Sequence, residues 1–352
     1  MKSQTILVVN PGSTSTKIAV SDGAELVRNE TLRHSAEELK RFPRIWEQYA
    51  FRLELCRQWA KEQNRRYDAV AALGGLLRSL EGGTYRVNEA MLADARRNLQ
   101  GEHASNLGCA IAADLAADFE CPAFVVDPVS VDEFTPLAYY SGHPRIKRRS
   151  LSHALNLHSI ARKTALLIGA PLESSSFVIA HMGGGISVAP LKGGKIVDVN
   201  DAASDGPFSP ERTGGLPLQP LITLSFSGEM KEEEVRSMVM GRGGLIAYLG
   251  TNKADEVEER IARGDAFARE VYEAMAYQIS KEIGAMATVL HGAVDAIILT
   301  GGLAHSAIFT SWIRDRVKFI APVRCMPGED EMSALAEGCR RVLCGEEQER
   351  IY

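Results

Sequence analysis

The chain has 352 residues, of which 45% are hydrophobic and 24% are charged, and its formal net charge at pH 7 is −5. This composition is that of a globular protein long enough for two domains. No basic stripe dominates and no apolar run reaches the length of a membrane span, so we expect neither a nucleic-acid nor a membrane partner. The six cysteines form no Cys-x-x-Cys pair, which favours reduced thiols in a cytoplasmic protein.

The first informative pattern lies in residues 6–20, where an apolar run enters a turn rich in glycine and hydroxyl side chains and a second apolar run leaves it. This pattern predicts strand, turn and strand. Gly12 permits close approach of a ligand, and Ser13, Ser15 and Lys17 offer hydroxyl groups, backbone N–H groups and a cation that suit a polyphosphate. The spacing is not that of a P-loop, which opens a helix. Taken alone, the segment is equally compatible with an ordinary polar hairpin.

Helical patterns follow. Residues 36–65 carry apolar side chains at helical spacing with charged residues between them, which predicts one long helix packed on the first sheet. A second helical stretch, residues 105–119, leads into a buried strand at residues 123–126 that ends in Asp127. The C-terminal run at residues 331–342 predicts a helix that covers the first domain.

The pattern of residues 6–27 recurs in residues 177–198 at a constant offset of 171, without a gap. Asn10 then matches His181, and Gly12 matches Gly183. Further along, a helical stretch and a buried strand that ends in Thr300-Gly301-Gly302 are expected to match the helix and strand that end in Asp127. A repeat of this length indicates two similar domains rather than a solenoid.

We therefore expect an α/β protein with two duplicated domains. The predicted first domain comprises residues 1–127 and about 326–352, and the second comprises residues 128–325. The two glycine turns and the two strand ends are expected to face each other across an interdomain cleft, since ligands favour domain boundaries and the carboxyl ends of strands.

The chain resembles the acetate and butyrate kinase family, and butyrate kinases most, within the larger group of actin-like (ribonuclease H-like) ATPases. The motifs that carry the resemblance span nearly the whole chain in order: VVNPGSTSTK (8–17), GGLL (74–77), EGGTY (81–85), HALN (153–156), HMGGG (181–185), GPFSPER (206–212), LGTN (249–252), AMAYQ (274–278), TGGLAHS (300–306) and PGEDE (327–331). The resemblance implies two actin-like domains, of which the second binds nucleotide. It also implies reversible in-line transfer of the γ-phosphoryl group of ATP to a short-chain carboxylate, with Mg²⁺ as cofactor.

Butyrate or a branched C4–C5 acid is the expected acceptor. Acetate or propionate kinase activity, and a nucleotide-binding relative that transfers nothing, are the alternatives. The resemblance also implies a homodimer or higher homo-oligomer, formed through the helix at residues 274–286, although a helix buried within its own domain fits the same pattern.

Transfer of a phosphoryl group to an ionised acid needs positioning and neutralisation of charge rather than a strong base. The resemblance assigns Arg212 as the catalytic cation and Asp127 as the catalytic carboxylate, and it places His181 and His153 at the transferring oxygens. Glu331 is the expected Mg²⁺ residue together with Asp127 and Asn10, with Glu329 and Asp330 as close rivals.

The remaining expected site residues bind the nucleotide or the acid. For ATP or ADP they are Asn10, Gly12, Ser13, Ser15, Lys17, Gly183, Gly184, Gly185, Asn252, Gly301, Gly302 and Ala304. For the acid they are Gly74, Gly75, Asn106 and Arg78.

The chain departs from the family pattern at Leu73, where the family has an arginine expected to bind the acid's carboxylate. Three outcomes are open: Arg78 replaces that arginine, apolar contacts and Arg212 bind the acid, or the protein is impaired. Lys253, where the family often has aspartate, leaves the details of nucleoside recognition open.

Overall fold

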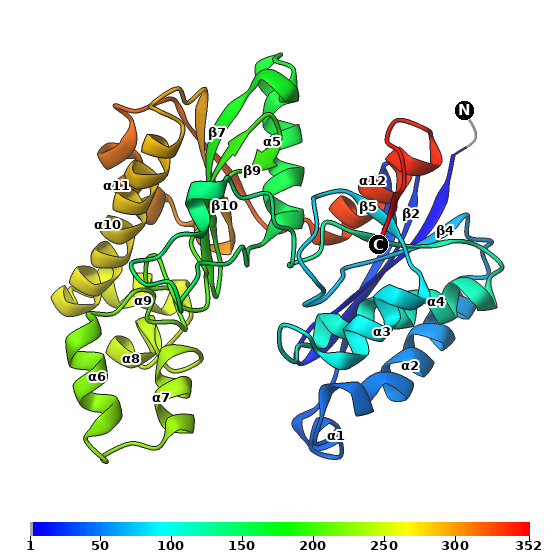
Figure 1. Ribbon diagram of the computed structural model, residues 1–352, viewed down its shortest axis with the longest axis horizontal. Coiled ribbons are helices and arrows are strands. Elements are labelled where there is room, and N and C mark those ends of the chain that lie inside the picture. Colours follow the sequence, from blue (N-terminus) through cyan, green and yellow to red (C-terminus); the bar gives the residue numbers. More distant parts are fainter. Residues whose placement is uncertain (1–2) are drawn as a thin grey trace. The chain divides into compact units, whose positions relative to one another are not determined.

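The computed structural model describes residues 3–352, which form two compact units. Unit 1 runs to Asp132 and also contains residues 154–156 and 330–352, and unit 2 contains residues 133–153 and 157–329. Each unit has its own β-sheet with helices on both faces (Figure 1). No helix among residues 3–352 is long and apolar enough to cross a membrane.

Unit 1 is built on a seven-stranded sheet with the order β12-β5-β6-β4-β1-β2-β3. Strands β1, β2 and β3 form the predicted antiparallel meander, and β4 and β6 continue the sheet parallel to β1. The elements are β1 (Thr5–Pro11), β2 (Ser15–Asp22), β3 (Glu25–Arg33), α1 (Ala36–Lys40), α2 (Tyr49–Glu62), β4 (Ala69–Ala72), β5 (Thr84–Arg86), α3 (Glu89–Arg97), α4 (Gly108–Asp118), β6 (Ala123–Val126), α12 (Glu331–Leu343) and β12 (Arg350–Ile351), with 3₁₀ turns at Ile45–Gln48 and Ala104–Leu107.

Alternate residues of the central strands of unit 1 serve two hydrophobic cores, as the period of a strand requires. Leu7 and Val9 face helices α2 and α4, whereas Ile6 and Val8 face helix α12, which contributes Leu335 among others. Figure 1 shows these helices on opposite sides of the sheet. The predicted C-terminal helix over the first sheet is therefore confirmed.

The prediction of one helix over residues 36–65 is wrong in its continuity. Helix α1 ends at Lys40, and helix α2 begins only at Tyr49 after a 3₁₀ turn. Pro43 lies in the break. Proline has no backbone N–H to donate, and it disfavours a helical conformation for the residue before it. The second part of the segment does pack on the first sheet, as predicted.

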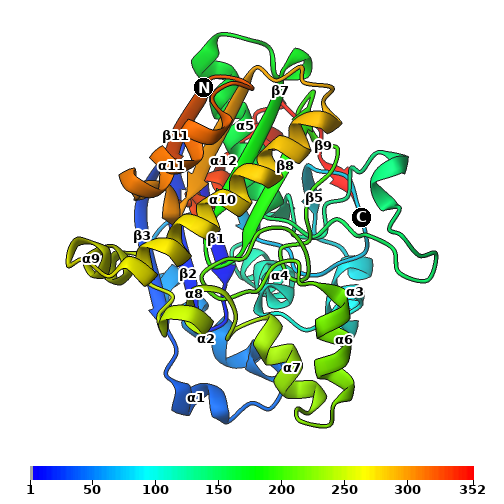
Figure 2. The ribbon, with the colours of Figure 1, turned by 90° about the vertical axis from the view of Figure 1, so that its left-hand side faces the viewer.

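Unit 2 has a five-stranded sheet with the order β11-β10-β7-β8-β9. Helices α10 and α11 cover one of its faces, as the view in Figure 2 shows. The elements are α5 (Ala154–Ile168), which begins with the three residues grouped with unit 1, β7 (Ser176–Met182), β8 (Ile186–Lys192), β9 (Lys195–Ile196), α6 (Leu218–Phe226), α7 (Glu232–Val239), α8 (Gly244–Leu249), α9 (Ala254–Ala262), α10 (Ala266–Val289), β10 (Ala296–Gly301), α11 (Ala307–Val317) and β11 (Val323–Pro327), with 3₁₀ turns at Pro136–Tyr139, Leu172–Ser174 and Gly302–His305.

The duplication is real, but the two glycine turns differ in length, so the prediction of a gapless repeat is wrong. Pro11 pairs with Thr16 across the first turn, which leaves four residues, 12–15, between the two paired positions. Met182 pairs with Ile186 across the second turn, which leaves three. A one-residue difference within a loop does not disturb the strands on either side of it, and for this reason it is invisible to a pattern of apolar runs.

The predicted match between the strand at residues 123–126 and that at residues 296–299 is also wrong. Strand β4, not β6, lies beside β1, and β10 lies beside β7 in the corresponding place. Strand β6 therefore corresponds to β11. This places Gly74-Gly75 after β4 in the same position as Gly301-Gly302 after β10. Both strands are short buried runs, and such runs do not reveal their neighbours in a sheet.

The packing of helix α12 on strand β6 generates a stability prediction. A Cβ atom added to Gly338 would overlap with the Val126 side chain, whereas one added to Gly284 in helix α10 would meet nothing within 4 Å. Gly338→Ala should therefore lower the free energy of unfolding by about 1–3 kcal/mol, as overpacking does. Gly284→Ala, the matched control, should raise it by up to about 1 kcal/mol through helix propensity. Urea denaturation measures both, and a Gly338→Ala variant as stable as the wild type would contradict the packing.

Candidate functional site

The first glycine turn presents N–H groups outward because its carbonyl groups are held by the rest of unit 1. Arg52 donates hydrogen bonds to three of the four carbonyls of residues 12–15, and the backbone N–H of His34 donates to the fourth, at 2.9 Å. Among the residues that the structure describes, the N–H groups of Ser13 and Thr14 have no acceptor. Two adjacent free N–H groups at an exposed bend form a concavity suited to an anion.

Gly12 does not owe its presence to backbone strain. The nearest heavy atom to a Cβ atom at this position would be the Ser15 carbonyl oxygen, at 3.5 Å, which is an ordinary van der Waals contact. The fold would therefore tolerate alanine here. The space left by the absent side chain lies beside the free N–H groups, which agrees with the predicted approach of a ligand.

Three of the expected site residues of unit 1 meet at one carboxylate. The Glu331 Oε2 atom accepts a hydrogen bond from Asn10 Nδ2 at 2.8 Å. It also forms an ion pair with Lys17 Nζ at 3.2 Å. Asn10 is the penultimate residue of strand β1, Lys17 lies opposite it on β2, and Glu331 begins helix α12. The sheet thus joins residues more than 300 positions apart in the chain.

Asp127 directly follows strand β6 and is buried. Its backbone has a φ of 38°, which is rare for a residue with a side chain and is found where the surroundings hold it in place. The Asp127 Oδ1 atom accepts the Gly83 N–H at 2.7 Å, and the Asp127 N–H donates to the Gly83 carbonyl at 3.0 Å. Part of this carboxylate is therefore used to fix the loop before strand β5.

Asn106, expected to bind the acid, is occupied within the fold. It is buried, its Oδ1 atom accepts the N–H of Leu76 at 2.8 Å, and its Nδ2 atom donates to Asn98 Oδ1 and to the Gly101 carbonyl. A Cβ atom on Gly75 would overlap with Asn106. Both amide hydrogens are used, so the side chain braces the Gly74-Gly75 loop.

Arg78, the expected substitute for the missing family arginine, is also engaged. Its Nε atom donates to Asp94 Oδ2 at 2.7 Å, and its guanidinium group lies over the Tyr352 ring, 4.8 Å from the centroid. Leu73, at the position of that arginine, packs against the hydrophobic core that includes Ile6. The one arginine within residues 73–78 is thus engaged by Asp94 and Tyr352.

The second glycine turn repeats the design of the first. The N–H of Gly183 closes the turn on the Gly185 carbonyl at 3.1 Å, and the Gly184 carbonyl accepts the hydroxyl of Ser209 at 2.5 Å. The N–H groups of Gly184 and Gly185 have no acceptor within residues 3–352. A Cβ atom on Gly183 would lie 2.8 Å from Glu329 Oε1, so a larger residue here would force the Glu329 side chain to move.

Arg212 lies against the second turn. A Cβ atom on Gly185 would be 2.5 Å from Arg212 Nη1, and Nη1 donates to the Ala202 carbonyl at 2.9 Å. The Arg212 N–H donates to the Ser209 hydroxyl, which also holds the turn at Gly184. Burial lowers the pKa of Arg212, but a guanidinium group keeps its charge in proteins. A fixed cation therefore lies beside the free N–H groups of unit 2.

His153 and His181 lie together behind this turn, with their ring centroids 4.4 Å apart. His153 Nδ1 is 2.9 Å from the Ser187 hydroxyl, and burial, followed by the influence of His181, lowers the pKa of His153 to about 3. His153 is therefore neutral at physiological pH. His181 is fully enclosed, and its Nε2 atom is 3.2 Å from Glu329 Oε1.

The residues expected at the nucleoside lie near the same turn. Gly301 has a φ of 87° and packs on the Met182 backbone, where a Cβ atom would not fit. Gly302 is exposed with open space around it, and Ala304 is buried in the following 3₁₀ turn. Asn252 is exposed and donates to Glu211 Oε1 at 2.6 Å.

Arg52 contributes to the first turn although the sequence pattern does not single it out, because the helical pattern of residues 36–65 places it among the charged residues between apolar positions. It is entirely buried. The sequence does place Arg52 directly before Leu53, beside the apolar stripe of the helix that continues at Cys56, and this position is compatible with burial. That signal is weak, because arginine at such a position usually extends to solvent.

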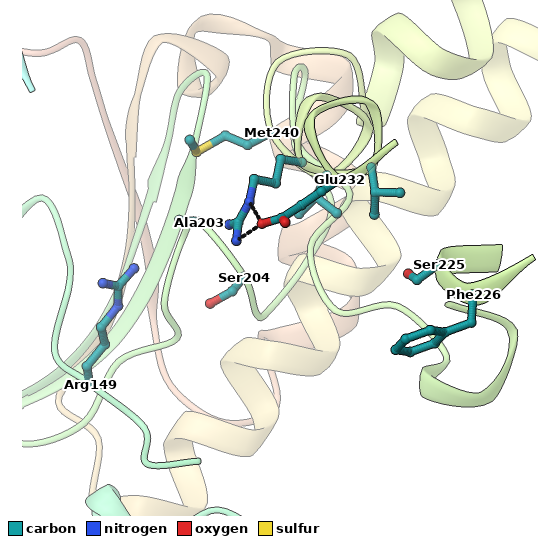
Figure 3. A pocket seen from close by; sticks show the side chains of 10 residues that line it. Arg149, Ala203, Ser204, Ser225, Phe226, Glu232 and Met240 are labelled. Atoms are coloured by element: carbon teal, nitrogen blue, oxygen red, sulfur yellow. Dashed lines mark hydrogen bonds and ion pairs between the residues drawn. The ribbon is translucent and has the colours of Figure 1, made fainter. Parts of the chain in front are cut away.

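A pocket of unit 2 with a volume of about 690 Å³ is not lined by the expected site residues (Figure 3). Its lining includes Phe226, Val239, Met240 and Arg149, and the last is paired with Asp201 at 2.8 Å. None of the residues expected to be catalytic lines this pocket. A four-carbon acid would fill only a small part of it.

The helix expected to form an oligomer interface, α10, buries one face within its own unit. Met275, Ile279, Ile283 and Met286 all belong to the core of unit 2. These side chains are not available to a second copy of the chain.

Two related units, each built on a strand meander with a glycine turn that leaves adjacent N–H groups free, define a protein of the actin-like ATPase class. The chain belongs to the acetokinase family, whose model matches residues 135–321. It is 51% identical to the probable butyrate kinase of Listeria welshimeri and 48% identical to butyrate kinase 2 of Clostridium acetobutylicum, and each alignment covers 99% of both chains.

Solved structures confirm the fold. The acetate kinase of Porphyromonas gingivalis superposes with a TM-score of 0.76 over 96% of this chain and 99% of its own, at 16% sequence identity. A propionate kinase from Francisella tularensis superposes with a TM-score of 0.73 over 95% of this chain and 98% of its own, also at 16% identity. The predicted family and fold class are therefore correct.

The half-buried His153 generates a prediction about pH. A histidine with a pKa of about 3 in the folded protein and about 6.5 in the unfolded chain makes the unfolded state bind more protons between these values. Stability is then lost as the pH falls below about 6.5. Between pH 7 and pH 5.5 this one group should remove about 1 kcal/mol from the free energy of unfolding. Urea denaturation at both pH values should show that loss reduced in His153→Asn, with the exposed His143→Asn as the control. Equal losses in wild type and His153→Asn would contradict the assignment.

Proposed function

We propose that this protein transfers the γ-phosphoryl group of ATP to a short-chain carboxylate, either butyrate or a branched C4–C5 acid, and that it also catalyses the reverse reaction. The observation that carries the proposal is the pair of glycine turns, each with two adjacent N–H groups that have no acceptor among residues 3–352. The choice of butyrate rather than acetate or propionate rests on the relatives of about 50% identity that are named butyrate kinases.

The chemistry needs no proton transfer. A carboxylate oxygen of the acid attacks the γ-phosphorus, the bond from that phosphorus to the β–γ bridging oxygen breaks, and ADP leaves with the electron pair. The protein must offset the charge on the transferring oxygens. We assign this role to Arg212, the fixed cation at the second turn. The neutral His153 can donate one N–H to an oxygen while Ser187 fixes its ring, and His181 lies beside it.

The chain's own residues fit a Mg²⁺ ion that is held mostly by water and phosphate oxygens. Within the described residues no three His, Cys, Asp or Glu side chains are grouped as ligands, so no all-protein metal cage is present there. Mg²⁺ commonly takes only one or two carboxylates. We propose that Glu331 and Asp127 supply these carboxylates and that the Asn10 amide orients Glu331. When bound, the ion neutralises phosphate charge.

For the acid, we propose that Gly74 and Gly75 leave room for the acyl chain and that Arg212 attracts its carboxylate. Arg78 is held by Asp94 and Tyr352, so we do not propose that it replaces the missing arginine. Leu73 extends the apolar surface beside the loop. Leu73 is also the one feature that supports an impaired protein, and the assay below decides this point.

We further propose a cytoplasmic homo-oligomer. All six cysteines are free thiols, as expected in a reducing compartment. Helix α6 exposes Leu218, Ile222 and Phe226, an apolar surface of the kind that a second copy of the chain covers.

Acyl-hydroxamate formation from Mg-ATP with acids from C2 to C6 tests the proposed function. The wild type should form acyl phosphate with the highest kcat/KM on C4 or branched C4–C5 acids. Arg212→Gln should lower kcat by a factor of about 10²–10³, as the removal of one preorganised charge-stabilising donor does, while MgADP still binds. The exposed Arg236→Gln is the matched control and should resemble the wild type. ATP binding without acyl phosphate from any acid would overturn the proposed function, and near-normal turnover would remove Arg212 from the mechanism.

A further inference from the structure

Arg52 is a fully buried arginine whose hydrogen-bonding capacity is directed at one turn. It lies on helix α2 with none of its surface exposed to solvent. Nη1 donates to the carbonyls of Gly12 at 2.8 Å and Ser15 at 3.0 Å and to Thr16 Oγ1 at 3.2 Å, and Nη2 donates to the Ser13 carbonyl at 3.1 Å.

The far side of the guanidinium group is held as firmly as the near side. Gln48, one helical turn earlier, accepts from Nε at 3.0 Å and from Nη2 at 2.8 Å. No carboxylate is paired with Arg52 in the described part of the chain. Its charge is therefore balanced only by carbonyl, hydroxyl and amide dipoles.

This arrangement is costly for a residue whose task is only to fill space. A buried charge without a counter-ion destabilises a fold, and an apolar side chain of similar volume would pack on the same core without that cost. Leu53 and Cys56, its neighbours on the helix, belong to that core. What an apolar residue cannot do is satisfy three carbonyl groups at a sharp turn.

We propose that Arg52 is the positioning residue of the first phosphate-binding turn. By holding the carbonyls of Gly12, Ser13 and Ser15 toward helix α2, it keeps their lone pairs away from an anion and leaves the N–H groups of Ser13 and Thr14 directed outward. The unpaired positive charge of Arg52 lies behind the backbone of the turn, on the side away from the anion, and it strengthens the attraction of the turn for that anion. The inference rests on the proposed function in taking that anion to be a nucleotide polyphosphate.

His34 supports the turn from a second side. Its N–H holds the Thr14 carbonyl at 2.9 Å, and its Nε2 atom is 2.9 Å from Thr16 Oγ1, which Arg52 also contacts. Burial, followed by the charge of Arg52, lowers the pKa of His34. His34 therefore stays neutral and leaves Arg52 as the fixed charge behind the turn.

The test compares binding of a ligand that has phosphates with binding of one that has none. Arg52→Met keeps the length of the side chain but removes its charge and its donors, and Arg52→Lys keeps the charge with fewer donors. Arg57→Met is the matched control on the same helix, because Arg57 pairs with Asp118 and Glu54 instead. Calorimetry measures the Kd of MgATP and of adenosine for each protein, and a thermal unfolding curve shows whether each variant is folded.

For Arg52→Met we expect the Kd of MgATP to rise at least tenfold and that of adenosine to change less than twofold. Arg52→Lys should fall between Arg52→Met and the wild type, and Arg57→Met should bind as the wild type does. If Arg52→Met fails to fold, Arg52→Lys provides the test. Its Kd for MgATP should rise at least threefold while its Kd for adenosine stays unchanged, and a Kd for MgATP equal to that of the wild type would contradict the proposal.

A folded Arg52→Met that binds MgATP within twofold of the wild type would overturn the proposal. So would equal losses for MgATP and adenosine, since these would indicate general damage to the fold. The proposed function fails separately: a wild type that binds MgATP but forms no acyl phosphate overturns that function and leaves the Arg52 comparison intact. A wild type that does not bind MgATP overturns both.

Discussion

Each peptide group in a turn offers one donor and one acceptor, and only the donor attracts a phosphate. The proposed function depends on how the two glycine turns separate these groups. In the first turn, Arg52 and His34 take up the carbonyls and leave two N–H groups free. In the second turn, the Ser209 hydroxyl holds the Gly184 carbonyl, and Arg212 lies on the open side. The same backbone chemistry is thus supported by an arginine placed differently in the two units.

The duplication explains why the two units can differ in role. Strand pairing places Gly74-Gly75 and Gly301-Gly302 in equivalent positions after β4 and β10. By the same pairing, Asp127 after β6 corresponds to Pro327 in β11. One unit therefore keeps a buried carboxylate at a strand end where the other keeps none. Among the repeated glycines, an added Cβ atom would collide with its surroundings at Gly74, Gly75 and Gly301 but not at Gly302.

Local features of the sequence predict the turns, most of the strands and the existence of the helix at residues 331–342, because each depends on residues close together in the chain. The break at Pro43 was legible but was outweighed by the periodicity around it. The equivalence of β4 with β10 and the inward direction of Arg52 depend on which strands and helices lie side by side. That information belongs to tertiary packing, and one sequence does not contain it in a readable form.

We propose that both turns take up nucleotide phosphates through their free N–H groups, and hydrogen–deuterium exchange measures this most directly. With saturating MgADP, peptides that contain Ser13-Thr14 and Gly184-Gly185 should both exchange more slowly than in the free protein, because bound phosphate oxygens occupy those N–H groups. Adenosine should leave both unchanged. Slower exchange at only one turn, or at neither while MgADP is bound, would contradict the claim.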